Sequence, residues 1–197
     1  LDGLAASGGR ALPMTERLLQ RISRKDNSQV LIGAFGQRWH VLQAVADMPD
    51  RVWVALDRVR DPGNLGTVMR TADAVGAAGI ILVGDCTDPY SVEAVRASMG
   101  SVFNVKIINC SEAEFIAFGT FWSGRVIGTA LPAAVDYRRA DYDGSLILLM
   151  GNEQAGLTAP LMDMCDQLIK IPMQGRTDSL NLAVATGVAL YTAIDQR

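Results

Sequence analysis

Three polar segments of the chain carry side chains that can bind and orient a small molecule. Each segment follows an apolar run that has the length of a β-strand. The segments contain Asn64 and Arg70 in the first, Gly151, Asn152, Glu153 and Gly156 in the second, and Ser179, Leu180 and Asn181 in the third. Amides, hydroxyls and a carboxylate offer hydrogen-bond donors and acceptors, and glycines let the backbone approach a ligand closely. The pattern therefore predicts a ligand cradle built from three loops.

The first segment has the pattern of a turn that leads into a helix. Pro62 and Gly63 indicate the turn, and Asn64 is in position to cap the helix that follows. Arg70 is six residues farther along, off the apolar face of that helix, so we expect it to point away from the core. The apolar face consists of Leu65, Met69 and Ala72. A structural interpretation stays open, in which Asn64 is only a cap and Arg70 only a solvated charge.

The second and third segments each place polar groups after a strand. Gly-Asn-Glu follows the apolar run 145–150 directly, and this position makes Glu153 a candidate for chemistry. The alternative is that Glu153 caps the next helix. In the third segment, Pro172 and Gly175 interrupt the chain after the expected strand. We expect Ser179 to start a helix whose first turn contains Asn181, with its polar groups facing the cradle.

The elements that must position these residues alternate regularly between strand and helix. Their order predicts an α/β fold with a largely parallel sheet and helices on both faces. Ligand sites in such sheets favour the carboxyl ends of the strands, where all three segments lie. The expected strands are 29–35, 51–57, 79–84, 102–108, 125–130, 145–150 and 167–171, and the expected helices are 15–25, 64–77, 91–99, 112–122, 157–165 and 179–194. The regular pattern begins at residue 51, which predicts an N-terminal segment 1–50 and a main domain 51–197.

The amino-acid composition limits the classes of protein to which the chain can belong. A chain of 197 residues that is 49% hydrophobic can form one domain with a sizeable core. No apolar run reaches the roughly 18 residues of a membrane span, so no membrane association is expected. Three widely spaced cysteines favour free thiols in a reducing cytoplasm over zinc or disulfides. The net charge of −3 is uneven, because residues 1–60 carry +3 and residues 61–197 carry −6. Any contact with RNA is therefore expected to rely on the N-terminal third and on local basic spots.

Several common chemistries lack their sequence signatures. The chain has no GxGxxG after a strand and no GxxxxGK[ST], which disfavours an ordinary dinucleotide or nucleotide enzyme. The lone histidine, His40, lies outside the regular α/β region, which weakens a Ser-His-Asp or Cys-His arrangement. No metal site is expected from the spacing of histidines and cysteines.

Together the three segments resemble the signature motifs of the SpoU (TrmH-like) family of RNA ribose methyltransferases, part of the SPOUT class. The resemblance covers about residues 51–195 and includes the stretches Asp88-Pro-Tyr and Arg96-Ala-Ser-Met-Gly100. The matched positions are Asn64 and Arg70 in the first motif, Gly151-Asn152-Glu153 and Gly156 in the second, and Ile171-Pro172-Met173 and Ser179-Leu180-Asn181 in the third. One departure is Ala183, which stands where the third motif usually has a serine.

This resemblance implies a fold, a cofactor and partners. The C-terminal part would be threaded into a deep trefoil knot, and the chain would form a homodimer packed at the knot. Residues 1–50 would be the tail of a truncated RNA-binding domain plus a linker. The cofactor would be S-adenosylmethionine. Its expected binding residues are Thr129, Ala130, Leu131, Gly151, Asn152, Gly156, Ile171, Met173 and Leu180.

The implied reaction is methylation of a ribose 2′-hydroxyl in structured RNA, either ribosomal RNA or tRNA. The 2′-hydroxyl would also explain a preference for RNA over DNA. The expected catalytic residues are Asn64, Arg70, Glu153, Ser179 and Asn181. Because a guanidinium stays protonated, Arg70 is interpreted as a clamp on a phosphate or a stabiliser of the developing alkoxide, and not as a base. Asn64 and Glu153 would orient Arg70 and the ribose, and Ser179 and Asn181 would order the cofactor loop and the acceptor.

Two other functions stay open at this stage. The first is a catalytically silent RNA-binding relative of the same fold, which the intact polar residues of the motifs disfavour. The second is a small-molecule methyltransferase or another α/β enzyme. Transfer of a labelled methyl group to RNA separates these possibilities.

Overall fold

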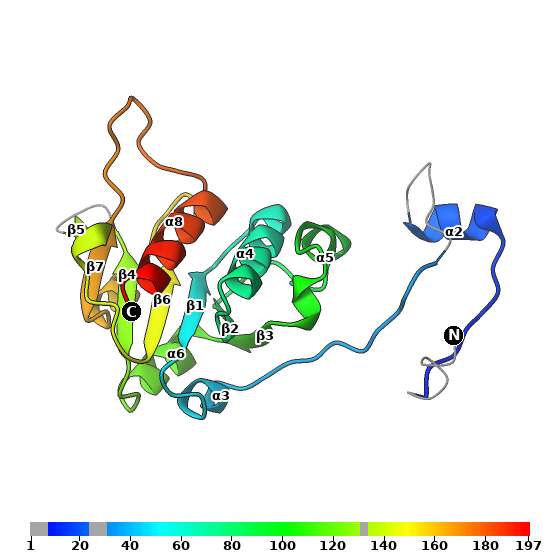
Figure 1. Ribbon diagram of the computed structural model, residues 1–197, viewed down its shortest axis with the longest axis horizontal. Helices are drawn as coiled ribbons and strands as arrows, with labels where there is room; N and C mark the ends of the chain where they lie inside the picture. Colours follow the sequence, from blue (N-terminus) through cyan, green and yellow to red (C-terminus); the bar gives the residue numbers. More distant parts are fainter. Residues whose placement is uncertain (1–7, 24–30, 131–133) are drawn as a thin grey trace. The chain divides into compact units, whose positions relative to one another are not determined.

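The computed structural model describes residues 8–23, 31–130 and 134–197 and divides the chain into two compact units, Leu1–Gln37 and Arg38–Arg197 (Figure 1). In the first unit, α2 (Glu16–Ser23) confirms the helix expected there. The strand expected at 29–35 is wrong for residues 31–35, which form no regular structure, and its first two residues lie outside the described ones. The β-branched and aromatic residues of this stretch favoured a strand, but the stretch has no ladder partner among the described residues.

The second unit contains a sheet of seven strands with the order β3-β2-β1-β6-β4-β7-β5. Every paired strand in it is parallel. The strands are β1 (Val52–Asp57), β2 (Gly79–Val83), β3 (Lys106–Cys110), β4 (Arg125–Thr129), β5 (Val135–Asp136), β6 (Leu146–Met150) and β7 (Gln167–Lys170). This sheet confirms the predicted α/β architecture.

Helices cover both faces of the sheet, and each face has its own core (Figure 1). The alternation along β1 shows how the two cores are divided. Val54 packs with residues of α4 and α8, whereas Ala55 packs with residues of α3, α6 and α7 on the other face. The helices are α3 (Gln43–Ala46), α4 (Pro62–Ala74), α5 (Val92–Ala97), α6 (Glu112–Gly119), α7 (Ala159–Asp163) and α8 (Leu182–Asp195), with 3₁₀ turns η1 (Ser101–Phe103) and η2 (Tyr137–Arg139).

Among the element boundaries that differ from the prediction, two have a clear local cause. The strand expected at 102–108 begins only at Lys106, because Met99 and Gly100 have positive φ values of 51° and 98° and turn the chain into η1 first. The helix expected from Ser179 begins at Leu182, because Asn181 is its N-cap. The trefoil knot stays a prediction, since a strand order does not specify how the chain is threaded.

The topology gathers the motif-bearing loops at one edge. The neighbouring strands β1, β6, β4 and β7 all run in the same direction, so their carboxyl ends at Asp57, Met150, Thr129 and Lys170 lie along the same edge. The helix that follows β1 is fixed by close packing: a Cβ at Gly66 would lie 2.4 Å from the Ala94 carbonyl oxygen of α5. This contact sets where α4 presents its first turn to the loops.

The described residues include neither a membrane-spanning helix nor a group of metal-ligating side chains. Among the helices in the described part of the chain, none combines the length and the apolar character that a membrane crossing requires. Within the same residues, no three histidine, cysteine or acidic side chains are grouped so that they could hold a metal ion.

Candidate functional site

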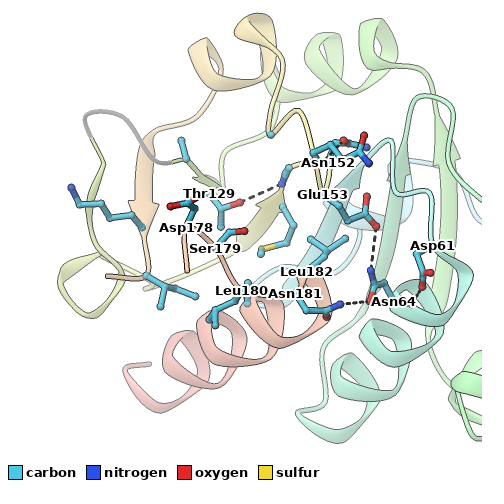
Figure 2. A pocket seen from close by; sticks show the side chains of 18 of the residues that line it. Asp61, Asn64, Thr129, Asn152, Glu153, Asp178, Ser179, Leu180, Asn181 and Leu182 are labelled. Carbon is cyan, nitrogen blue, oxygen red and sulfur yellow. Dashed lines mark hydrogen bonds between the residues drawn. The ribbon is translucent and has the colours of Figure 1, made fainter. Parts of the chain in front are cut away.

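A cavity of about 870 Å³ lies at the carboxyl ends of β4, β6 and β7, beside the first turns of α4 and α8 (Figure 2). All three polar segments contribute to its lining. The predicted residues that line it are Asn64, Thr129, Ala130, Gly151, Asn152, Glu153, Gly156, Ile171, Met173, Ser179, Leu180 and Asn181. Two predicted residues are not among them: Arg70 is exposed on α4, and Leu131 lies outside the described residues.

Asn64 is not the cap of α4, contrary to the prediction from sequence. Asp61 is the cap, and its side chain accepts a hydrogen bond from the Asn64 backbone N–H at 2.6 Å. The Asn64 side chain is therefore available to the cavity, where its Nδ2 donates to Glu153 Oε1 at 3.4 Å. Its Oδ1 accepts a bond from Asn181 Nδ2 at 2.9 Å (Figure 2). One amide thus joins residues from all three motifs.

Asn181 connects this network to the last helix. Its Oδ1 accepts from the backbone N–H groups of Ala183 and Val184 at 2.9 and 3.3 Å, which fixes the side chain as the N-cap of α8. Its Nδ2 remains free to donate to Asn64. The departure from the third motif at Ala183 leaves this cap intact, because Ala183 contributes only its backbone N–H.

The loop 151–156 is a tight turn closed by its own backbone. Asn152 and Gly156 exchange N–H···O bonds at 3.2 and 3.0 Å, and Gly156 has a φ of +67°. A Cβ at Gly151 would lie 2.7 Å from the Gly156 carbonyl carbon and from the Leu157 nitrogen, so glycine is required there. Glu153 is exposed and does not cap the next helix, because Thr158 does. Glu153 is therefore available to a ligand.

Three further hydrogen bonds hold the cavity wall. Thr129 Oγ1 lies 3.3 Å from the Gly151 backbone nitrogen, which donates to it, and 3.4 Å from the Leu149 carbonyl oxygen. The Ala130 N–H donates to the Ile169 carbonyl at 3.0 Å. These bonds join the ends of β4, β6 and β7 into one surface.

The charged residues of the lining were not part of the prediction, apart from Glu153. Arg60 and Lys170 line the cavity together with Asp61, Glu153 and Asp178, so acidic groups outnumber basic ones. Arg60 is also paired with an acidic residue outside the lining, Asp85, at 2.7 Å. The lining therefore favours a ligand with net positive charge.

Arg70 lies on a different side of α4 from Asn64. A separation of six residues corresponds to 120° around a helix axis at about 3.6 residues per turn. Arg70 is exposed, as the sequence predicted. Arg70 is therefore not part of the lining of the cavity in its own chain.

The cysteines are unsuited to nucleophilic catalysis. Burial raises the pKa of Cys86 to about 11, and it raises the pKa values of Cys110 and Cys165 to about 12. Thiols with such pKa values are protonated at neutral pH and are poor nucleophiles. At the cavity, hydrogen bonds join the side chains of Asn64, Glu153 and Asn181 instead.

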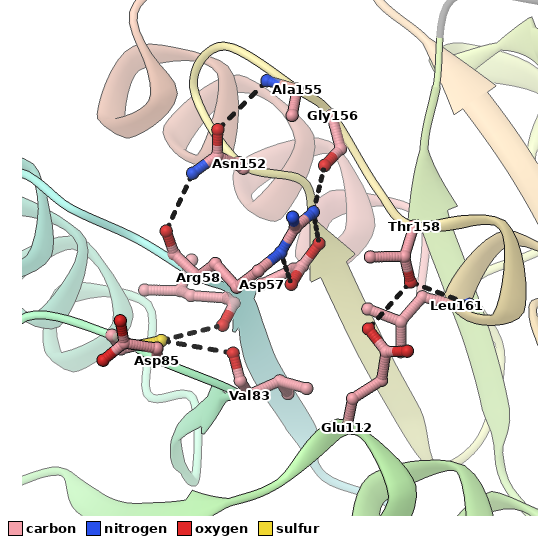
Figure 3. A network of polar contacts seen from close by, with 12 residues as sticks. Asp57, Arg58, Val83, Asp85, Glu112, Asn152, Ala155, Gly156, Thr158 and Leu161 are labelled. Atoms are coloured by element: carbon pink, nitrogen blue, oxygen red, sulfur yellow. Dashed lines mark hydrogen bonds and ion pairs between the residues drawn. The ribbon is translucent and has the colours of Figure 1, made fainter.

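One feature of the site that the sequence did not predict is an ion pair beneath the loop 151–156. Arg58 bonds the buried carboxylate of Asp57 through two N–H groups, both at 2.8 Å, and also donates to the Gly156 carbonyl at 3.2 Å (Figure 3). The Asp57 carboxylate raises the pKa of Arg58 above its ordinary value. The sequence offered one signal for this pair, an acidic residue at the end of an otherwise apolar strand.

The fold and the cavity together define an α/β domain with a cavity of small-molecule size at the carboxyl edge of a parallel sheet and without a glycine-rich phosphate loop. Residues 51–191 match the family described as the SpoU rRNA Methylase family, and the chain belongs to it. This membership confirms the family that the three motifs indicated.

Curated relatives and solved structures agree with this assignment. The chain is 33% identical to the Bacillus subtilis 23S rRNA (guanosine(2553)-2′-O)-methyltransferase RlmP over 76% of this chain and 63% of that protein, so it spans less than two thirds of the relative's length. It is 32% identical to the Ralstonia nicotianae 23S rRNA (guanosine-2′-O-)-methyltransferase RlmB over 100% of this chain and 81% of that one. The AdoMet-bound rRNA methyltransferase from Sinorhizobium meliloti superposes with a TM-score of 0.94 at 49% identity, covering 98% of this chain and 74% of that one.

Proposed function

We propose that this chain transfers a methyl group from S-adenosylmethionine to the 2′-hydroxyl of a ribose in structured RNA. The observation that carries the proposal is the joining of Asn64, Glu153 and Asn181, one from each motif, at the lining of a single cavity. Ribosomal RNA is the first substrate class to test, because the named relatives act on 23S rRNA. A tRNA is the second.

The cavity fits S-adenosylmethionine in size and charge. Small-molecule sites range from about 300 to 1,000 Å³, and this cavity of about 870 Å³ falls within that range. The acidic excess of its lining suits a sulfonium cofactor. When bound, the cofactor supplies an electrophilic methyl group. The residues proposed to hold it are Thr129, Ala130, Leu131, Gly151, Asn152, Gly156, Ile171, Met173 and Leu180.

The residues at the lining would orient the acceptor. Methyl transfer needs the attacking oxygen in line with the methyl group and its leaving atom, so most of the task is positioning. Asn64 would hold Glu153 toward the ribose, and Asn181 would keep the Asn64 amide turned correctly by occupying its Oδ1. Ser179 is exposed in the cavity lining, where it would help to order the cofactor loop and the acceptor. Arg70 would bind a neighbouring phosphate or the developing alkoxide.

Cofactor binding and methyl transfer test this function directly. S-adenosylmethionine at about 100 times its dissociation constant should stabilise the fold by about 2.7 kcal/mol. The stabilisation should need no added metal, and labelled methyl groups should appear as 2′-O-methylribose in ribosomal RNA. Binding of RNA without any methyl transfer would instead identify a catalytically silent relative. An absent thermal shift with saturating cofactor would contradict the cofactor assignment.

We also propose that the protein is a homodimer. Val184, Tyr191 and Ile194 of α8 are 52, 57 and 38% exposed, which is high for apolar side chains on a helix that packs against the sheet. The exposed position of Arg70 outside its own cavity further supports a site completed by a second subunit. Light scattering should give twice the chain mass across a range of concentrations. A monomeric mass that does not change with concentration would overturn the dimer.

The proposal extends to the N-terminal segment and to the place of action. Residues 1–50, which carry a net charge of +1, would be the tail of an RNA-binding domain with its linker. The last part of that segment, from Arg38, belongs to the same compact unit as the sheet. Three free thiols are consistent with action in the cytoplasm.

A further inference from the structure

Arg58 joins three parts of the structure around the cavity, although it does not line the cavity itself (Figure 3). Its guanidinium holds both oxygens of Asp57 and donates to the Gly156 carbonyl at 3.2 Å. Its backbone N–H donates to the Val83 carbonyl at 2.9 Å, and its own carbonyl accepts from Asn152 Nδ2 at 2.8 Å. Both ends of the turn 152–156 are therefore tied to one residue.

The pairing with Asp57 makes Arg58 a rigid anchor. Asp57 is 1% exposed, and a buried carboxylate is costly unless it is paired and hydrogen-bonded. Arg58 has a φ of +48°, in the left-handed region that side-chain-bearing residues rarely adopt. Such a conformation persists only where the surrounding contacts determine it. The two N–H bonds to Asp57 hold the guanidinium beside the loop.

The turn depends on this anchor because most of its other bonds are internal. Asn152 Oδ1 accepts from the N–H groups of Gln154 and Ala155, both at 3.0 Å, and the Asn152–Gly156 pair closes the turn. These bonds shape the turn but do not place it against the sheet. The two bonds to Arg58 do, at the end of β1, together with the bond from the Gly151 N–H to Thr129 and the bond from Asn64 to Glu153.

We propose that Arg58 is a positioning residue, which sets the placement of the loop 151–156 and thereby the affinity for S-adenosylmethionine. The inference rests on the proposed function, because it assumes that this loop binds the cofactor. Lysine at this position would keep an attraction to Asp57. It would lose the planar fork that bonds two carboxylate oxygens and a carbonyl at once.

The test compares Arg58→Lys with the matched control Arg125→Lys. Arg125 likewise pairs with a carboxylate, that of Asp141, and donates to a carbonyl, but it begins β4 at the opposite edge of the sheet from the cavity. In ligand-free Arg58→Lys, amide hydrogen exchange of a peptide covering 151–157 should be faster than in the wild type. The cofactor dissociation constant should rise about tenfold, as for one lost charged hydrogen bond. The single-turnover rate at saturating cofactor should change little, and Arg125→Lys should alter none of these.

Each outcome decides the inference. Unchanged exchange at 151–157 in Arg58→Lys would overturn it, and so would faster exchange with unaltered cofactor affinity. An equal loss of affinity in Arg125→Lys would show a general loss of stability instead of positioning. If the wild-type protein itself fails to bind S-adenosylmethionine, the proposed function fails, and the part of the inference that concerns cofactor affinity fails with it. The exchange measurement then still decides whether Arg58 positions the loop.

Discussion

Replacing Arg70 with alanine is expected to slow methyl transfer by about 10² or more while leaving S-adenosylmethionine binding unchanged. Arg70 is exposed on α4 and does not line the cavity, so its truncation removes no cofactor contact and little packing. If it binds a phosphate or the developing alkoxide, its loss removes charge and orientation together. Single-turnover methylation measures the rate, and calorimetry measures the cofactor affinity.

Arg70→Lys tests the geometry of the same contact. Lysine keeps the charge but not the planar fork, so it should restore the rate only partly. Mixing Arg70→Ala chains with chains that carry an intact Arg70 but a defective Asn64 tests which subunit supplies the arginine. Recovered activity in the mixture places Arg70 at the partner's cavity. Near-normal methylation by Arg70→Ala would exclude the catalytic role, and loss of cofactor binding would move Arg70 to the cofactor site.

The centre of the sheet was predictable from sequence because β1, β2 and β6 are short, largely apolar runs buried on both faces. Leu146–Met150 of β6 and Gly79–Val83 of β2 show this, since neither run can belong to a half-exposed element. The pattern failed at 102–105, where the apolar residues Val102 and Val105 pack in the core from a turn and not from a strand. Burial alone does not distinguish a turn from a strand.

The cavity was predictable because parallel strands bring their carboxyl ends to one edge. The residue that caps α4 was not predictable from sequence, because Asp61 and Asn64 are both suitable caps. Only the backbone geometry selects Asp61. Arg58 was missed because its contact at Gly156 is 98 residues away in sequence. Its neighbours in the sequence give no indication of that carbonyl.

Replacing Asn64 with aspartate is expected to lower the methyl-transfer rate by about 10² at pH 8, and the loss should shrink as the pH falls. The variant has nearly the same shape and keeps the backbone bond to Asp61, so the fold should persist. It replaces the amide donor, 3.4 Å from Glu153, with a carboxylate. Two like charges at that distance repel by about 1 to 4 kcal/mol in a site near the surface. Glu153 should then turn away from the acceptor.

The pH dependence arises because the two neighbouring carboxyl groups of the Asn64→Asp variant can share one proton when the pH is low enough. A carboxyl beside another carboxylate holds its proton to a higher pH than an isolated one does. Below that pH one of the two carboxyl groups is protonated and can donate a hydrogen bond to the other, as the Asn64 amide does in the wild type. The activity of the variant relative to the wild type should therefore rise as the pH falls. Asn104→Asp is the matched control, because Asn104 Nδ2 donates to Asp73 at 3.0 Å outside the cavity. A rate loss that does not vary with pH, or one that Asn104→Asp shares, would show that the Asn64–Glu153 contact does not orient the acceptor.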